Sequence, residues 1–385
     1  MSAEHPLVQQ ARSLGAAFAL RSGEIEVARR LPADIAKQMG AAGFYRLFVA
    51  EHLGGLEVAP ALAARIYEAL AEGDAACGWI AFIGATTCLA FARMTDAAVR
   101  EIFDAKESLI VGVFAASGVA TKVDGGFRVS GRWQFGSGSQ NADWIGGGCT
   151  LVENGKVLTN SAGVPRNHML FFRASDVRSL DTWHTSGLRG TGSTDFEVHD
   201  LFVPDAHASG YLVKGLPDRP LFRFPQFAPL AHGVAAVAMG IARASITELT
   251  RIAGEKKRYG TSVTLANRPH CQIEVARAEA RLRSARAFFY ETIEAAWSLA
   301  CAGAPMPIEV RRDMRLATTH ALQASCEAVD AMYTLAGGGA VYDSSPLQRH
   351  LRDVHVASQH IMVSTNTLET IGQLLLGIEA NTATL

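Results

Sequence analysis

The spacing of the apolar residues changes twice along the chain, and this order of patterns is the feature that most constrains its fold. In residues 1–108 the pattern is helical, and Pro32 and Gly43 are placed to begin and end one helix. Residues 109–220 form short runs rich in Gly, Thr, Ser, Val and Phe between turn sequences such as DGG and ENG, which is typical of antiparallel strands. Helical patterns return in residues 221–385. The sequence therefore predicts an α+β protein with an N-terminal α-helical domain, a middle antiparallel β domain and a C-terminal helical domain.

The C-terminal part has the spacing of long amphipathic helices. One helix is indicated by apolar residues at steps of three and four: Leu282, Ala285, Phe289, Ile293, Ala296 and Ala300. Similar patterns cover residues 228–255, 307–336 and 345–377. Four long helices in succession are typical of a four-helix bundle.

Composition and spacing exclude several classes of function. The 36 basic and 37 acidic residues are interspersed and give a net charge of −1, so no surface for nucleic acid or an anionic membrane is predicted. The six cysteines have no CxxC pair and no metal-ligand spacing, which indicates reduced thiols and no metal site. The N-terminus is not a signal peptide and no apolar run approaches a membrane span, so we expect a cytoplasmic protein. No glycines have the spacing of a nicotinamide fingerprint, so a redox enzyme of this sequence would take its electrons from another donor.

The segment GRWQFGSG, residues 131–138, is a candidate ligand site at the end of a predicted strand. The strand is indicated by apolar residues in every second position: Phe127, Val129, Trp133 and Phe135. It ends in Gly136, Ser137 and Gly138, where glycines let backbone amides approach a ligand and the serine hydroxyl can donate or accept a hydrogen bond. An ordinary hairpin turn is the alternative interpretation.

Two further segments carry polar groups in a pattern that suggests binding. The turn in residues 187–204, GLRGTGSTDFEVHDLFVP, can offer amides and the Arg189 guanidinium to an anion, although a plain surface turn fits equally well. The run RDVHVASQH ends in His360 within an apolar helical pattern, and such a run often lines a cavity. His355 and His360 are about 140° apart around a helix and cannot share a metal. A structural histidine is the alternative for His360.

Together these motifs and the order of domains resemble the acyl-CoA dehydrogenase superfamily over essentially the whole chain. The turn and strand of residues 187–204 are similar to that superfamily's Arg-Gly turn and the strand that follows it, and GRWQFGSG is similar to its flavin-facing segment. Within the superfamily, the chain more closely resembles two-component flavin-dependent monooxygenases, which act on phenols, indoles or sulfur heteroarenes. The residues that carry this resemblance are Trp133 to Gly138, and Ser345 to Arg349 running through Arg352 and Asp353 to His360.

The chain departs from the dehydrogenase pattern at the catalytic base. A dehydrogenase needs a carboxylate over the flavin to remove an α-proton. Residues 359–363, where the family commonly has a glutamate, read QHIMV, and the other known position for the base lies in 227–242, which contains no acid. Oxygenation is therefore favoured. A dehydrogenase or oxidase whose base lies elsewhere, and a flavin-binding protein without catalysis, are the alternatives.

The resemblance implies a catalytic role for two residues. In these monooxygenases reduced flavin and O2 form a C4a-hydroperoxide, which the protein shields from water and holds by hydrogen bonds until an electron-rich ring attacks it. His360 matches the hydrogen-bonding partner of the hydroperoxide, and Ser137 matches the contact to flavin N5. The cofactor-binding residues implied by the same motifs are Trp133, Phe135, Ser137, Gly138 and Arg258, with Trp133 and Phe135 forming the wall beside the flavin ring and Arg258 meeting a phosphate.

The resemblance also bears on the substrate and the partners. Phenol hydroxylases of the family often have a histidine after Gly-Trp in the first domain, which can activate the phenol. Here the segment GWIAFIGATTCLAF has no histidine, and Trp79, Thr86 and Thr87 are the predicted pocket residues. An indole-like ring needs no deprotonation, so it is favoured over a phenol. We further expect reduced FAD or FMN from a separate flavin reductase, O2 as cosubstrate, and a homotetramer.

Overall fold

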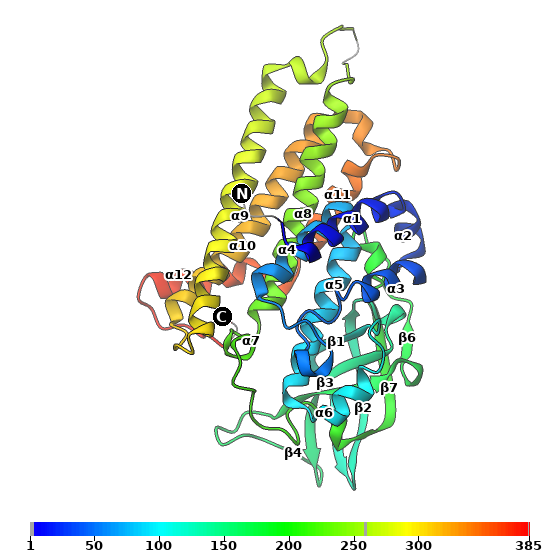
Figure 1. Cartoon of the computed structure of the whole chain (residues 1–385), viewed down its shortest axis with the longest axis vertical. Coiled ribbons are helices and arrows are strands. Elements are labelled where there is room, and N and C mark those ends of the chain that lie inside the picture. The colour runs from blue at the N-terminus through cyan, green and yellow to red at the C-terminus, as the bar shows by residue number, and fades with distance from the viewer. Residues whose placement is uncertain (1–3, 258–259, 384) are drawn as a thin grey trace.

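The computed structural model describes residues 4–257, 260–383 and 385. Figure 1 shows a bundle of long helices at one end of the molecule and a twisted sheet at the other, with the N-terminal helices alongside both. This succession of helices, sheet and helices confirms the predicted α+β fold.

The N-terminal helices join the sheet to the bundle. Their bounds are α1 Pro6–Ala19, α2 Ser22–Ala28, α3 Ala33–Ala41, α4 Pro60–Gly73, α5 Ala75–Thr87 and α6 Asp96–Ile102. Helix α4 packs on α8 of the bundle, while α5 packs on both α8 and strand β1. Helix α5 begins after Asp74, whose carboxylate accepts hydrogen bonds from the backbone N–H groups of Ala76 and Cys77 at 3.0 and 3.4 Å. Because its side chains are almost all buried, α5 lies in the centre of the molecule.

The middle part is a seven-stranded sheet. Its strands are β1 Ile110–Val123, β2 Gly126–Gly136, β3 Trp144–Glu153, β4 Lys156–Val157, β5 Asn167–Arg173, β6 Arg178–Leu180 and β7 Thr194–Pro204. The order is β4-β3-β1-β2-β7-β6, and β5 pairs with β3. The expectation of a purely antiparallel sheet is wrong, because β1 and β3 are parallel. The loop after β2 carries the chain past β1, so that β3 adds to the other side of β1 in the same direction.

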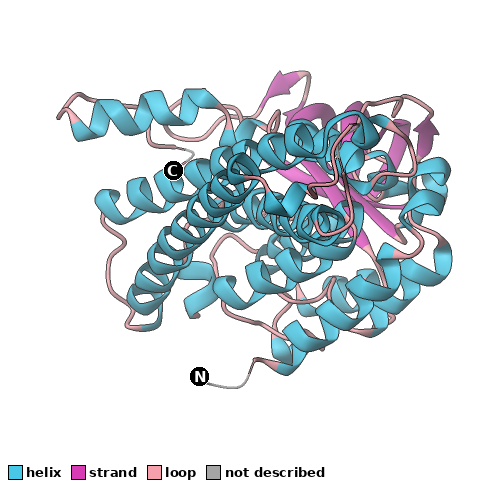
Figure 2. Cartoon of the chain, turned by 90° about the horizontal axis from the view of Figure 1, so that it is seen from above, coloured by secondary structure: helices cyan, strands magenta, loops and turns pink. Residues whose placement is uncertain are grey.

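The C-terminal part contains long helices that lie side by side (Figures 1 and 2). The helices of this part are α7 Pro220–Arg223, α8 Ala228–Ala253, α9 Pro269–Cys301, α10 Ile308–Ala336, α11 Pro346–Ala357 and α12 Thr365–Leu375, and the long ones that pack together are α8, α9 and α10. The single helix expected over residues 345–377 is therefore two helices. His360 lies in the break between them, not within a helix as the pattern suggested, and its side chain caps the short turn Ile361–Val363.

Two apolar helices form the centre of the molecule. The segment Ala75–Arg93 and helix α8 are long and apolar enough to cross a membrane by length and composition, with 78% and 83% of their most apolar windows buried in the structure. The sequence-based expectation that no run approaches this length was wrong. Since α8 packs on α4, α5 and α10, its apolar character is that of a core helix.

Candidate active site

Three parts of the chain that are far apart in sequence meet beyond the end of β2. Trp79 of α5 donates a hydrogen bond from Nε1 to Oγ of Ser137 at 3.1 Å. The ring of His360, from the break between α11 and α12, lies against Trp79 edge to face, with 5.9 Å between the ring centroids. The structure thus brings together Ser137, His360 and one of the three predicted pocket residues.

The backbone just before Ser137 is distorted in a way that turns Phe135 outward. The pairing of β2 with β7 is irregular between Trp133 and Gly136, and Phe135 has a positive φ of 62°. A non-glycine residue in this conformation is strained, which is common at functional sites. The Phe135 side chain is 68% exposed and makes an edge-to-face contact with Trp183, with ring centroids 6.4 Å apart. Phe135 and Trp183 therefore form an aromatic surface beside Ser137.

The structure also contradicts the role in the flavin site that was expected of Trp133. The resemblance implied that Trp133 and Phe135 together form the wall beside the flavin ring. The Trp133 side chain is instead fully buried, stacks on Phe196 with centroids 5.1 Å apart, and donates from Nε1 to the carbonyl oxygen of Gly148 at 2.8 Å. It has no exposed face for a cofactor, and the wall role that we assigned to it does not hold.

Ser137 is one end of a buried row of hydroxyl groups, which we call the hydroxyl chain (Ser137, Ser193 and Thr191). Oγ of Ser137 lies 2.7 Å from Oγ of Ser193, which lies 2.6 Å from Oγ1 of Thr191. Oγ1 of Thr191 donates to the carbonyl oxygen of Leu188 at 2.7 Å. The turn noted in the sequence as an anion-binding candidate thus contacts Ser137 through its hydroxyl groups. Its Arg189 donates to the carbonyl oxygen of Thr185.

His360 is a neutral hydrogen-bond donor at neutral pH. Its Nδ1 accepts a hydrogen bond from the backbone N–H of Met362 at 3.2 Å, so the neutral ring carries its proton on Nε2. Burial, followed by the positive charge of Arg315, lowers the pKa of His360 to about 4. Among the described residues Nε2 has no hydrogen-bond partner, which leaves its N–H group available to a ligand.

Arg315 and Asp353 hold the two sides of the site in place. Arg315, buried on α10, donates from Nη1 to the carbonyl oxygen of Met362 at 2.8 Å and so fixes the turn that carries His360. Asp353, buried on α11, accepts a hydrogen bond from the backbone N–H of Leu188 at 2.6 Å. Leu188 has a positive φ of 49°, and this bond secures the strained residue at the far end of the hydroxyl chain.

Asp353 is expected to make stability depend on pH. Burial raises its pKa to about 7, against about 3.9 for an unfolded chain, so its stabilising contribution is complete below about pH 4 and is lost as the pH rises through 7. Asp353→Asn stays neutral and keeps an acceptor for Leu188. The variant should therefore gain stability over the wild type between pH 5 and pH 8, by about 2 kcal/mol in urea unfolding. Asp124→Asn, on an exposed carboxylate in the turn between β1 and β2, is the control, and a difference that does not grow with pH would contradict the assignment.

The other predicted residues are placed as follows. Thr86 and Thr87 are buried in the last turn of α5, and Oγ1 of Thr86 donates to the carbonyl oxygen of Phe82 at 2.7 Å. Their role in a substrate pocket stays a prediction. Gly138 has a φ of 76°, and its N–H donates to the carbonyl oxygen of Thr191 at 2.8 Å, so it fixes the loop that carries Ser137. Arg258 lies outside the described residues.

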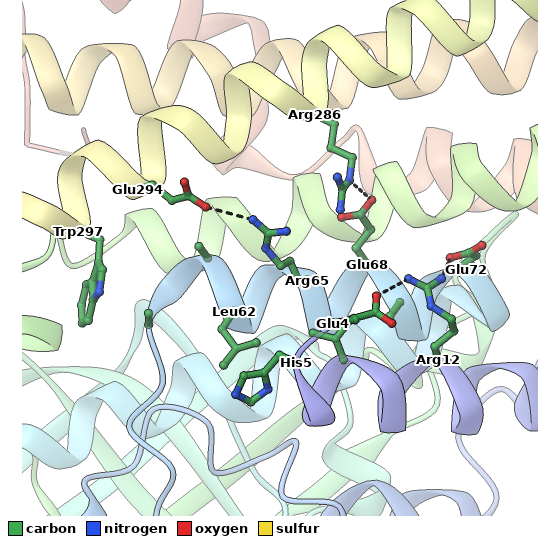
Figure 3. A pocket seen from close by; sticks show the side chains of 14 residues that line it. Glu4, His5, Arg12, Leu62, Arg65, Glu68, Glu72, Arg286, Glu294 and Trp297 are labelled. Carbon is green, nitrogen blue, oxygen red and sulfur yellow. Dashed lines mark hydrogen bonds and ion pairs between the residues drawn. The ribbon is translucent and has the colours of Figure 1, made fainter. Parts of the chain in front are cut away.

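A cavity of about 620 Å³ lies elsewhere, between α1, α4 and α9. Its charged side chains pair with one another, as Figure 3 shows: Arg12 with Glu4, Arg65 with Glu294, and Arg286 with Glu68. It contains none of the predicted site residues. Charge pairs that satisfy one another leave little for a ligand, so the junction around Ser137 is the better candidate for the active site.

Comparison with known proteins identifies the family. Residues 4–103 match the model of the acyl-CoA dehydrogenase N-terminal domain, and residues 232–365 match that of the acyl-CoA dehydrogenase C-terminal domain. Indole-3-acetate monooxygenase from Pseudomonas putida is 35% identical over 93% of this chain and 90% of its own length. The oxygenase component of an FADH2-dependent resorcinol hydroxylase from a Rhizobium species is 29% identical over 96% and 94%.

The solved structures agree with the sequence matches. XiaF from a Streptomyces species, in complex with FADH2 and glycerol, is 26% identical and superimposes with a TM-score of 0.88 over 98% of this chain and 97% of that one. The chain therefore belongs to the acyl-CoA dehydrogenase family, and within it to the flavin-dependent monooxygenases.

Proposed function

We propose that this enzyme oxygenates an indole, with O2 and a reduced flavin that a separate reductase supplies. The observation that carries the proposal is the position of His360, a neutral N–H donor beside Trp79 and Ser137 where a dehydrogenase of the family would need a carboxylate. An acid in the same part of the chain, Asp353, is occupied by the N–H of Leu188. The junction is thus suited to holding activated oxygen and not to removing a proton from a substrate.

The residues at the junction fit a flavin. The exposed ring of Phe135 and its neighbour Trp183 offer an aromatic surface for the flavin ring. Ser137 offers a hydroxyl oxygen to flavin N5, and His360 offers its Nε2–H group to O2 activated at the flavin. Reduced flavin, when bound, supplies the electrons that activate O2. Since the pKa of His360 is about 4, the ring is neutral at neutral pH. It donates a hydrogen bond but lacks the acidic proton of an imidazolium, whose transfer to the activated oxygen would favour release of H2O2.

The substrate class is supported by α5 and by the relatives. The helix offers Trp79 but no histidine between Trp79 and Thr87 that could deprotonate a phenol. An indole is already electron-rich and needs no such base. Two relatives, at 35% and 30% identity, are named indole-3-acetate monooxygenase, which makes indole-3-acetate the first compound to test.

The proposed reaction is tested with chemically reduced flavin. Protein, reduced FAD or FMN and indole-3-acetate are mixed with ¹⁸O2, and the product is analysed by mass spectrometry. We expect one ¹⁸O atom in the product, no product with oxidised flavin alone, and a lower yield with resorcinol.

Two results would contradict the proposal. Bleaching of oxidised flavin by an acyl-CoA without oxygen would identify a dehydrogenase. Flavin binding without turnover from any electron source would identify a protein without catalysis.

The relatives that are named as oxygenase components imply a flavin reductase partner.

We propose in addition a homotetramer in the cytoplasm. The end of the chain supports assembly, since the apolar side chains of Leu375, Leu376 and Ile378 are more than half exposed. Native mass spectrometry of the purified protein tests the assembly.

A further inference from the structure

We infer that the hydroxyl chain fixes the direction of the hydrogen bonds at Ser137 and thereby makes the site prefer reduced over oxidised flavin. The inference rests on the proposed contact between Ser137 and flavin N5. It assigns a role to Thr191 and Ser193, which lie behind Ser137 and act through it.

The direction follows from counting protons, starting at Leu188. A carbonyl oxygen only accepts, so Thr191 must donate its single hydroxyl proton to Leu188. Thr191 then has only lone pairs for Ser193, so Ser193 must donate to Thr191. Ser193 in turn has no proton left for Ser137, so Ser137 must donate to Ser193.

The other side of Ser137 is fixed as well. The indole Nε1–H of Trp79 is a donor only, so the Ser137 oxygen accepts from it. With its proton given to Ser193 and one lone pair taken by Trp79, Ser137 has one lone pair left. It can therefore accept a hydrogen bond from a ligand but cannot donate one.

This remaining lone pair distinguishes the two redox states of a flavin. Reduced flavin has a hydrogen on N5, which can donate to Ser137, whereas oxidised flavin has a lone pair there. When the Ser137 lone pair faces the N5 lone pair of oxidised flavin, neither group has a hydrogen-bond donor. Leaving two buried polar groups unpaired costs binding free energy. An oxygenase that receives its flavin from a reductase meets both states, and this preference keeps oxidised flavin from occupying the site.

The far end of the hydroxyl chain permits a clean test. The carbonyl oxygen of Leu188 also accepts from Nε1 of Trp183 at 3.0 Å and from the backbone N–H of Thr191 at 3.1 Å. Removal of the Thr191 hydroxyl therefore leaves this carbonyl paired. Thr191→Val keeps the shape of the side chain but lets Ser193 turn its proton toward Ser137, which frees the Ser137 proton for oxidised N5.

The experiment measures the dissociation constants of oxidised and reduced flavin under anaerobic conditions, and the reduction potential of the bound flavin. In the wild type, the dissociation constant of oxidised flavin should be larger than that of reduced flavin. In Thr191→Val the ratio of these two constants should fall about tenfold, and the reduction potential of the bound flavin should be about 30 mV lower. Thr191→Ser keeps the hydroxyl and should restore both values. Ser193→Ala should have the same effect as Thr191→Val and serves if the valine variant does not fold.

The control is Ser139→Ala, because the Ser139 hydroxyl lies in the same loop, 3.4 Å from that of Thr194, and outside the hydroxyl chain. An unchanged ratio in both Thr191→Val and Ser193→Ala would overturn the inference while leaving the flavin site intact. A wild type that binds flavin in neither state would overturn the proposed function as well.

Discussion

Replacement of His360 with alanine is expected to uncouple oxygen consumption from product formation. The variant loses the Nε2–H group, which has no hydrogen-bond partner among the described residues. Loss of a donor to developing or activated oxygen typically lowers catalysis by about a hundredfold or more. We expect the amount of product formed per flavin oxidised to fall at least about tenfold. Each mole of product lost should appear as one mole of H2O2, and both are measured in a single turnover with reduced flavin.

The control variant is His355→Ala. His355 lies five residues earlier, is exposed, and pairs with the Asp330 carboxylate at 2.7 Å, so its loss should leave coupling unchanged. His360→Gln retains a side-chain N–H and should recover part of the coupling. Because the pKa of His360 is about 4, wild-type coupling should also stay level from pH 6 to pH 8 as far as this group is concerned. Normal coupling in His360→Ala would show that the ring does not contact the oxygen.

The sequence was sufficient for the order of helices, sheet and helices, and its motifs named two residues that the structure places near each other. Helical and strand periodicities are local properties, and the three regions they marked are present in the structure. Ser137 and His360 were found from motifs, and the structure places both against Trp79. Their roles on the flavin remain predictions.

Features that depend on pairing between distant segments could not be found in this way. The irregular pairing of β2 with β7 buries Trp133 and exposes Phe135, although strict alternation put both on one face. The contact of Ser137 with Ser193 joins residues 56 positions apart, and only the glycine-flanked hydroxyls in GSG and TGS hinted at it. The break before α12 depends on the hydrogen bond from the Met362 N–H to the His360 side chain, which no periodicity reveals.

The hydroxyl chain also depends on how closely the Arg-Gly turn approaches α11. Gly187 lies against the backbone of that helix: a β-carbon at this position would come within 2.7 Å of the Asp353 nitrogen and closer still to the carbonyl group of Arg352. Backbone atoms cannot move aside as a side chain can. A methyl group here must therefore push the turn away from α11, which strains the 2.6 Å hydrogen bond between Leu188 and Asp353.

Gly187→Ala is accordingly expected to lower the free energy of unfolding by about 1–3 kcal/mol, the usual cost of overpacking. Urea unfolding measures this loss. The control is Gly372→Ala in α12, where a β-carbon meets no atom within 4 Å and alanine should be neutral or slightly stabilising. Because the displaced turn carries Thr191 and Ser193, the folded fraction of Gly187→Ala should also lose much of the preference for reduced flavin. A variant as stable and as selective as the wild type would show that the turn and α11 do not need this close contact, and that the hydroxyl chain is held by the turn alone.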